Sequence, residues 1–404
     1  MTKLRCTSVD LTEEEETPWT ESRRLRPNTP SRATATATQS SPNTPTVDLT
    51  EEEVLSKGLE CIHFGNRQEN DRKKPLRTER CRIQPNTPSR ATATQSSPST
   101  RTVDLTEEEA LSKGLEYVHF GKKRQEKVRK EENIRRFQGN YGLSPIAVAK
   151  VVGDLQTLLD QEHRIKKFNI LYFFLTLHWL CAYPTYVVLE GPWNLCREII
   201  GRTIKLYTKA IQRLKEHKIK WFEDGEIDEK DVFLVSVDGI HCRTYEVRSD
   251  PGKKWYSHKS HGAGFAYELA IAIRSNRLVW MNGPFYASKS DITMFRYGDG
   301  DEEEPGRNLR DMIPNGKRAI ADSGYSGEDG KTCSITRRSD SDEVKEFKAR
   351  AKSRQEQFNA KVKAFTCTAT EFRQGMEVHA AAFESVCVLL QYDMEYGHNL
   401  VFEV

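Results

Sequence analysis

The first third of the chain consists of repeated segments with little apolar periodicity. The string VDLTEEE occurs three times, starting at Val9, Val47 and Val103, and PNTPSRATAT occurs twice. The Ser, Thr and Pro residues between the copies cannot bury enough apolar surface to offset the entropy lost on ordering. The copies are also spaced too irregularly for a solenoid. We therefore predict a long disordered tail over 1–132, followed by a folded body.

The VDLTEEE copies have two interpretations. Thr50 and Thr106 each precede a glutamate by three residues, which is the capping box of a helix start, and the acidic first turn suits the helix dipole. The alternative is a SUMO-interacting motif, in which an extended apolar strand adds to a sheet edge and the acidic run meets a basic groove. Its anchors would be six apolar residues: Val9, Leu11, Val47, Leu49, Val103 and Leu105. The sequence leaves both interpretations open.

Composition excludes several classes of protein. The chain has 62 Lys and Arg against 59 Asp and Glu, so its net charge of +3 says little about partners. Its nine cysteines form no C-x-x-C pair, which fits reduced thiols better than a disulfide framework or a zinc ribbon. No apolar run reaches the roughly 18 residues of a membrane span, so no membrane partner is expected. A basic segment over 122–136 is either a solvated helix face or a nuclear-import or phosphate-contacting segment.

The region 133–225 has a helical apolar pattern. Ser144 followed by a proline predicts a helix start. The segment 168–183 is apolar nearly all round, which predicts a buried core helix. The segment 194–221 is expected to break at Gly201 and to carry basic residues on its outer face. Short helices with a basic final element favour a helix-turn-helix-like DNA-binding module, although a plain helical subdomain has the same pattern.

The pattern changes at about 226, where apolar alternation and short apolar runs replace the helical period. Strands are predicted at 232–239, 266–273, 277–285 and 317–325, and helices at 290–298, 341–365 and 371–396. This order predicts an α/β domain over 226–404, with a mixed sheet covered by helices.

Three acids occupy unusual positions in this domain. Asp238 follows the apolar run VFLVSV, and Asp322 follows a second apolar run, so both are predicted at the ends of buried strands. An acid there is costly unless it is paired or binds a cation. Glu356 falls off the apolar stripe of its helix, on a flank shared with Lys352, Asn359 and Lys363. Three such acids suit two Mg²⁺ or Mn²⁺ ions acting on a phosphodiester, although each alone could be a cap or a surface ion pair.

Basic residues near these acids are candidate contacts to DNA phosphates. One group lies in the loop KKWYSHKSHGAG, where the two histidines lack the glutamate of a zinc-protease helix. The other group surrounds Glu356. Together the predicted contacts are Lys253, Lys254, Lys259, Lys352, Arg354, Asn359 and Lys363.

The motifs VDGIHC, YELAIAI, SKSDITMFR, KRAIADSGYSGE and RQEQFNAKVKAF, in this order, resemble the DDE-type nuclease domain of PIF/Harbinger-like transposases. The resemblance covers about 232–404, and 135–156 is similar to the helical N-terminal region of the family. It implies a ribonuclease-H-like fold, divalent metal ions and DNA strand cleavage. Asp238, Asp322 and Glu356 match the catalytic triad, and Asp291 matches a further acid of the metal site. Ala321 and Gln355 depart from the family pattern beside the second and third acids.

The resemblance implies a transposase-derived endonuclease that acts on DNA in the nucleus. It also implies a homo-oligomer and a separate DNA-binding protein encoded by the same mobile element as partners. The alternative is a domesticated adaptor that binds DNA or SUMO and keeps the fold without cleaving. The intact acidic triad favours the nuclease.

Overall fold

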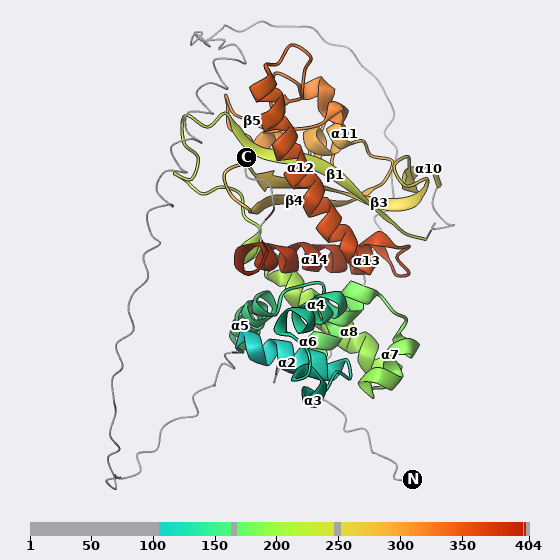
Figure 1. Ribbon diagram of the computed structural model, residues 1–404. Coiled ribbons are helices and arrows are strands. Elements are labelled where there is room, and N and C mark those ends of the chain that lie inside the picture. The colour runs from blue at the N-terminus through green and yellow to red at the C-terminus, as the bar shows by residue number, and fades with distance from the viewer. Residues whose placement is uncertain (1–104, 163–167, 246–251, 399, 401–404) are drawn as a thin grey trace, which may run out of the picture. The chain divides into compact units, whose positions relative to one another are not determined.

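The computed structural model describes residues 105–162, 168–245, 252–398 and 400 (Figure 1). Of the tail predicted over 1–132, residues 1–104 lie outside the described residues, and so do five of the six proposed SUMO anchors. None of the described helices is long and apolar enough to cross a membrane.

The N-terminal part of the described chain is helical, as predicted. Ser144 starts a helix with Pro145 in its first position, and its Oγ accepts a hydrogen bond from the Ala147 N–H at 3.4 Å. The predicted break at Gly201 is wrong, because one helix runs through that position. The helices are α2 (Glu107–Tyr117), α3 (Lys122–Gln125), α4 (Lys130–Tyr141), α5 (Pro145–Glu162), α6 (Ile170–Ala182), α7 (Tyr186–Trp193), α8 (Arg197–Arg213) and α9 (Lys215–Lys218).

Helix α2 corrects the predicted end of the tail at 132. Thr106 and Glu109 form the predicted capping box, but the helix then packs into the core. A Cβ at Gly114 would lie 2.4 Å from the Phe137 ring, and the Tyr141 hydroxyl donates to the Gly114 carbonyl at 2.6 Å. The third VDLTEEE copy is therefore a helix cap on a buried helix. Its Leu105 is buried in the same core, which removes that residue as a SUMO anchor.

The sheet is mixed, as predicted. Its strands are β1 (Phe233–Arg243), β2 (Tyr256–Ser257), β3 (Gly262–Ala272), β4 (Leu278–Tyr286), β5 (Arg318–Ile320) and β6 (Cys333–Ser334). Their order is β2-β3-β1-β5-β6, with β4 also paired to β3. The β1–β3 and β3–β4 pairs are antiparallel, whereas β1–β5 and β5–β6 are parallel.

Helices cover both faces of the sheet. On one face lies α12 (Asp342–Ala364), which crosses the sheet in Figure 1, with α14 (Met376–Tyr396) beside it. The other face packs against α11 (Asp291–Tyr297) and the 3₁₀ helix η2 (Ser323–Glu328), through the buried rings of Phe295 and Tyr325. The remaining helical turns are α10 (Gly252–Trp255), η1 (Arg310–Met312) and α13 (Thr366–Ala369).

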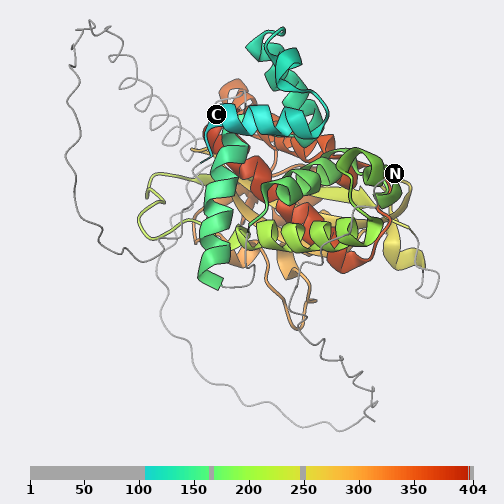
Figure 2. The same cartoon turned by 90° about the horizontal axis from the view of Figure 1, so that it is seen from below.

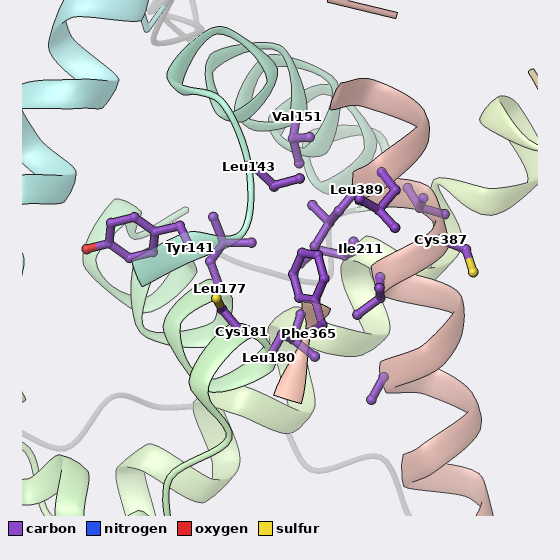
Figure 3. Packing of buried hydrophobic residues seen from close by; sticks show 14 of the residues in the cluster. Tyr141, Leu143, Val151, Leu177, Leu180, Cys181, Ile211, Phe365, Cys387 and Leu389 are labelled. Atoms are coloured by element: carbon purple, nitrogen blue, oxygen red, sulfur yellow. The ribbon is translucent and has the colours of Figure 1, made fainter. Parts of the chain in front are cut away.

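Helix α14 joins the helical region to the sheet. It packs against α5 and α8 on one side and contacts β4 on the other, and from below the green helices lie over it (Figure 2). One apolar core accordingly runs from α2 to β4. Figure 3 shows Phe365, Ile211 and Leu389 pointing into this core from three parts of the chain. Phe365 also packs on Gly142, where an added Cβ would lie 2.5 Å from the ring. The φ of Gly142 is 75°, which also favours glycine at this position.

Candidate catalytic site

Asp238 lies in the middle of β1, not at its end as predicted, because the strand continues to Arg243. Its neighbours on the α12 face hold it in place. Asn359 Nδ2 donates to Asp238 Oδ2 at 2.8 Å, and the Gly239 N–H donates to Oδ1 at 2.8 Å. One helical turn earlier, Gln355 Oε1 accepts from the Ser236 hydroxyl at 3.2 Å. Side chains at matching positions of β1 and α12 therefore fix the orientation of this carboxylate.

Asp322 lies beside Asp238, because their strands are adjacent. Strands β1 and β5 pair in parallel with Ser236 opposite Ile320, so the residues two positions further on, Asp238 within β1 and Asp322 just after β5, lie side by side. Asp322 is the N-cap of η2, and its Oδ1 accepts from the Gly324 N–H at 2.8 Å. The parallel pairing of β1 with β5 therefore brings the two aspartates together.

Asp291 reaches the same place from the first turn of α11. Two glycines make room for its carboxylate. A Cβ at Gly239 would lie 2.1 Å from Asp291 Oδ1, and one at Gly324 would lie 3.3 Å from Oδ2. Asp291 Oδ1 is buried and has no hydrogen-bond partner among the described residues. The three aspartates thus converge from β1, α11 and the end of β5.

The ammonium group of Lys259 lies among these carboxylates. It donates to Asp291 Oδ2 at 3.0 Å and to the Gly239 carbonyl at 3.1 Å, and it lies 4.0 Å from Asp238 Oδ1. We predicted a phosphate contact for Lys259, but in the structure its charge is directed at the acids. We refer to Asp238, Asp291, Asp322 and Lys259 as the acidic cluster.

The electrostatics of the acidic cluster follow from its burial and crowding. Burial raises the pKa of Asp238 to about 6, and the charges of Asp291 and Asp322 add to the rise, while Lys259 and the Gly239 N–H oppose it. Burial acts to lower the pKa of Lys259, but the neighbouring aspartates outweigh it and raise that pKa overall. Adding a cation would therefore relieve repulsion that a single ammonium only partly balances.

Glu268 is a further acid near the cluster that the sequence reasoning missed. It is opposite Gly239 in the β1–β3 pair and is fully buried. Trp280 Nε1 donates to its Oε2 at 2.9 Å, whereas Oε1 has no partner in the described part of the chain. Burial raises the pKa of Glu268 to about 8, and Asp291 contributes to the rise. The signal was present in YELAIAI, where an acid interrupts an otherwise apolar strand.

Glu356, the third predicted catalytic acid, is exposed on α12. It lies one turn before Asn359, the residue that binds Asp238, and side chains three apart share a helix flank. The structure therefore places Glu356 on the flank of α12 that reaches the acidic cluster, but outside the contacts that join the aspartates.

Two predicted DNA contacts on α12 have structural partners instead. Arg354 is buried, and its guanidinium donates to the carbonyls of Ile273 and Ser275 in the β3–β4 turn at 2.7 and 2.6 Å. Lys363 donates to the carbonyls of His241 and Thr368. Both assignments as DNA contacts are corrected, because the donors of these two side chains already bond to backbone carbonyl groups within the fold.

Of the remaining predicted contacts, Asn359 is bonded to Asp238, and the three lysines are accessible or nearly so. Lys253 and Lys254 are exposed on α10, with Lys254 Nζ 5.7 Å from the centre of the Tyr286 ring. Lys352 is half-buried and donates to Thr336 Oγ1 at 3.0 Å. His379 on α14 is a buried core residue, and its Nδ1 is hydrogen-bonded to the Tyr267 hydroxyl at 2.7 Å.

The donor atoms of the acidic cluster are of the kind that binds a hard divalent cation, but its side chains are not spaced as metal ligands. Its donors are carboxylate oxygens, one of them buried and unpartnered, and they already attract an ammonium ion. Such oxygens are the ligands that Mg²⁺ and Mn²⁺ prefer. Across the residues that the structure describes, however, no three acid, histidine or cysteine side chains are grouped so that they could hold a metal ion together.

Comparison with known proteins is consistent with this site. No curated protein and no solved structure matches the chain significantly. Residues 237–391 match the family model described as DDE superfamily endonuclease. The matched segment begins one residue before Asp238 and includes Asp291, Asp322 and Glu356. The match supports the assignment of this segment to the DDE endonuclease superfamily.

Proposed function

We propose that this protein is a transposase-derived endonuclease of the PIF/Harbinger type, which hydrolyses DNA phosphodiester bonds with two Mg²⁺ or Mn²⁺ ions. The observation that carries the proposal is the convergence of three aspartates around Lys259 within the segment that matches DDE endonucleases. The strand order β4-β3-β1-β5-β6, with antiparallel pairs first and parallel pairs last, supports a ribonuclease-H-like fold.

The residues have distinct roles in this proposal. Asp238, Asp322 and Asp291 would hold the cations, with Glu356 as a ligand that α12 brings in from its exposed flank. The bound ions would supply a nucleophilic water and stabilise the leaving oxygen. The Asn359 amide and the Gly239 N–H hold the Asp238 carboxylate in one orientation. This orientation limits the reorganisation that ligand binding requires.

The helical region would contact DNA as a helix-turn-helix-like module. Helix α8 buries one side against α14 and exposes Arg202, Lys205 and Lys209 on the other. Residues three and four apart lie on one helix face, so these cations form a stripe that matches a phosphate backbone. The basic segment 122–136 is less suited to this role, because Lys122, Lys130 and Arg136 each pair with a glutamate. That pattern supports its interpretation as a solvated helix face.

The nuclear location, the homo-oligomer and the separate element-encoded DNA-binding protein belong to the same proposal. They rest on the resemblance to transposases. SUMO binding by the first two VDLTEEE copies also stays a proposal, since those copies lie outside the described residues.

A non-cleaving adaptor is the second candidate. The observation that favours it is the spacing of the acids, since no metal-holding group of three is formed within the described chain. An adaptor would bind DNA through the same basic surfaces, and its acidic cluster would serve only as a buried ion-pair network.

Strand nicking by purified full-length protein separates the two candidates. The assay would use supercoiled DNA carrying a cognate end sequence, with Mg²⁺ or Mn²⁺ and any required partner protein. Under the nuclease proposal, Asp238→Asn, Asp322→Asn and Glu356→Gln abolish nicking while DNA binding survives, because a neutral amide is a poor ligand for a hard dication. Asp291→Asn should reduce nicking less.

The matched control is Glu343→Gln, which neutralises an exposed acid in the first turn of the same α12. It should nick like the wild type. Equal nicking by the wild type and all three triad variants would assign the activity to another site or a contaminant. No nicking by the wild type under these conditions would favour the adaptor.

A further inference from the structure

The ammonium group of Lys259 occupies the space among the carboxylates where the proposed metal ions would bind. A lysine predicted to meet a phosphate instead places its ammonium between two carboxylates, 3.0 Å from Asp291 Oδ2 and 4.0 Å from Asp238 Oδ1. The Gly239 carbonyl, on the same strand as Asp238, accepts a second hydrogen bond at 3.1 Å. This ammonium contacts the oxygens that a divalent cation would require.

The segment that carries Lys259 is anchored on both sides of this residue. Ser257 Oγ accepts from the Ser260 N–H at 3.1 Å and shares a hydrogen bond with His241 Nδ1 at 2.8 Å. These bonds fix the backbone next to β1, so the ammonium reaches the acids by its own four-carbon stem. The Lys259 side chain is 48% exposed, whereas that of Asp291 is only 11% exposed. The lysine head can therefore move into solvent without disturbing the backbone, whereas the aspartate cannot.

An ammonium and a divalent ion compete for this cluster of carboxylates. Two cations a few ångströms apart repel each other, and the repulsion is strong where water is largely excluded. We propose that Lys259 is a positioning residue that serves as the built-in counter-cation of Asp238 and Asp291, and that a divalent metal binds the acidic cluster only by displacing it. The displaced ammonium then lies at the exposed edge of the site, where it meets a substrate phosphate. This inference rests on the proposed function, since it takes the acidic cluster to be the metal site.

Direct Mn²⁺ binding tests the inference without any nuclease measurement. The loss of the electron paramagnetic resonance signal of free Mn²⁺ gives the dissociation constant for full-length protein at pH 7.5. Lys259→Met should bind Mn²⁺ at least about threefold more tightly than the wild type, the size expected from one half-exposed ion pair. Lys259→Arg keeps the competing charge, so it should stay near the wild-type value.

A charge control is available in Lys230→Met. Lys230 is exposed on the segment before β1. The first residue of β1 lies roughly 16 Å from Asp238 at the usual rise per residue of a strand, and Lys230 precedes that residue. It changes the net charge equally, so its Mn²⁺ affinity should match the wild type. If Lys259→Met does not fold, as judged by circular dichroism, Lys259→Gln replaces it, because an amide can still bond to the Gly239 carbonyl.

The outcomes separate this inference from the proposed function. Asp238→Asn should weaken Mn²⁺ binding at least about tenfold, because removing even a residue that only supports a metal ligand typically costs that much. If it does so while the neutral Lys259 variants bind no more tightly than the wild type, the counter-cation role is overturned and the metal site stands. If Asp238→Asn leaves Mn²⁺ binding unchanged, the metal is bound elsewhere, and the proposed function fails together with the inference.

Discussion

Replacing Asp238 by Asn should stabilise the folded protein in the absence of divalent metal. Burial and the neighbouring aspartates raise the pKa of this carboxyl from its usual 3.8 to about 6. Because the folded state then binds the proton more tightly than the unfolded state, the contribution of Asp238 to stability falls as the pH rises from about 4 to about 6. A pKa difference of about 2 corresponds to about 3 kcal/mol at pH 7.5.

The Asp238→Asn substitution also removes one of the two hydrogen bonds that the side chain accepts. Both oxygens of Asp238 accept hydrogen bonds, one from Gly239 N–H and one from Asn359 Nδ2, whereas an amide has a single oxygen. Losing one of these bonds costs about 1 kcal/mol. The net expectation is a gain of about 2 kcal/mol in the free energy of unfolding at pH 7.5. At pH 4.5 the electrostatic gain shrinks to about 1 kcal/mol, so the two effects cancel.

Thermal or urea unfolding of the wild type and Asp238→Asn in EDTA measures this difference. The variant should melt about 4 °C higher at pH 7.5 and at the wild-type temperature at pH 4.5. Asn359→Ala serves as the control, because it removes the same hydrogen bond and leaves the acid in place, and it should lower stability at both pH values. A variant less stable than the wild type at pH 7.5, or a gain that does not depend on pH, would refute the reasoning.

Three further predictions address other parts of the protein. The stability advantage of Glu268→Gln over the wild type should grow by about 2 kcal/mol as the pH rises from 5 to 7. Burial raises the pKa of Glu268 to about 8, so folding of the wild type takes up a proton across this range. A stability difference that stays constant over this range in urea titrations would contradict the prediction. Leu115→Ala should cost about 2–5 kcal/mol, since Leu115 is fully buried on α2; a loss below about 0.5 kcal/mol would restore the tail interpretation of α2. Replacing Arg202, Lys205 and Lys209 by Ala should reduce the slope of log K for DNA against log salt by about 2.7, and an unchanged slope would remove α8 from the DNA interface.

Most secondary-structure elements were predictable from the sequence because their signals are local. Apolar alternation marked three long strands of the sheet, and the capping residues Ser144 and Thr106 marked helix starts where the structure has them. The acids Asp238 and Asp322 stood out because each interrupts or ends an apolar run, and burial makes an unpaired acid costly. Such signals depend on only a few neighbouring residues.

The errors arose where distant residues decide the outcome. The end of the apolar run at Asp238 predicted a strand end, but nine residues of β3 pair with β1 and extend it to Arg243. Arg354 was predicted to contact DNA because it is close to Glu356 in the sequence, and only the position of the β3–β4 turn shows that its guanidinium is buried against carbonyl groups. A local sequence pattern indicates which residues can form a strand or a hydrogen bond. It does not indicate which distant segment supplies the partner.

The acidic cluster shows the same division. The chain order of Asp238, Asp291 and Asp322 and the glycines beside two of them could be recognised as a motif. The joining of the three aspartates depends on the parallel β1–β5 pair and on α11 packing against Gly239, and Lys259 reaches them from a loop 20 residues along the chain from Gly239. Contacts between segments so far apart are set by the packing of the whole sheet, because no short-range preference of the chain specifies them.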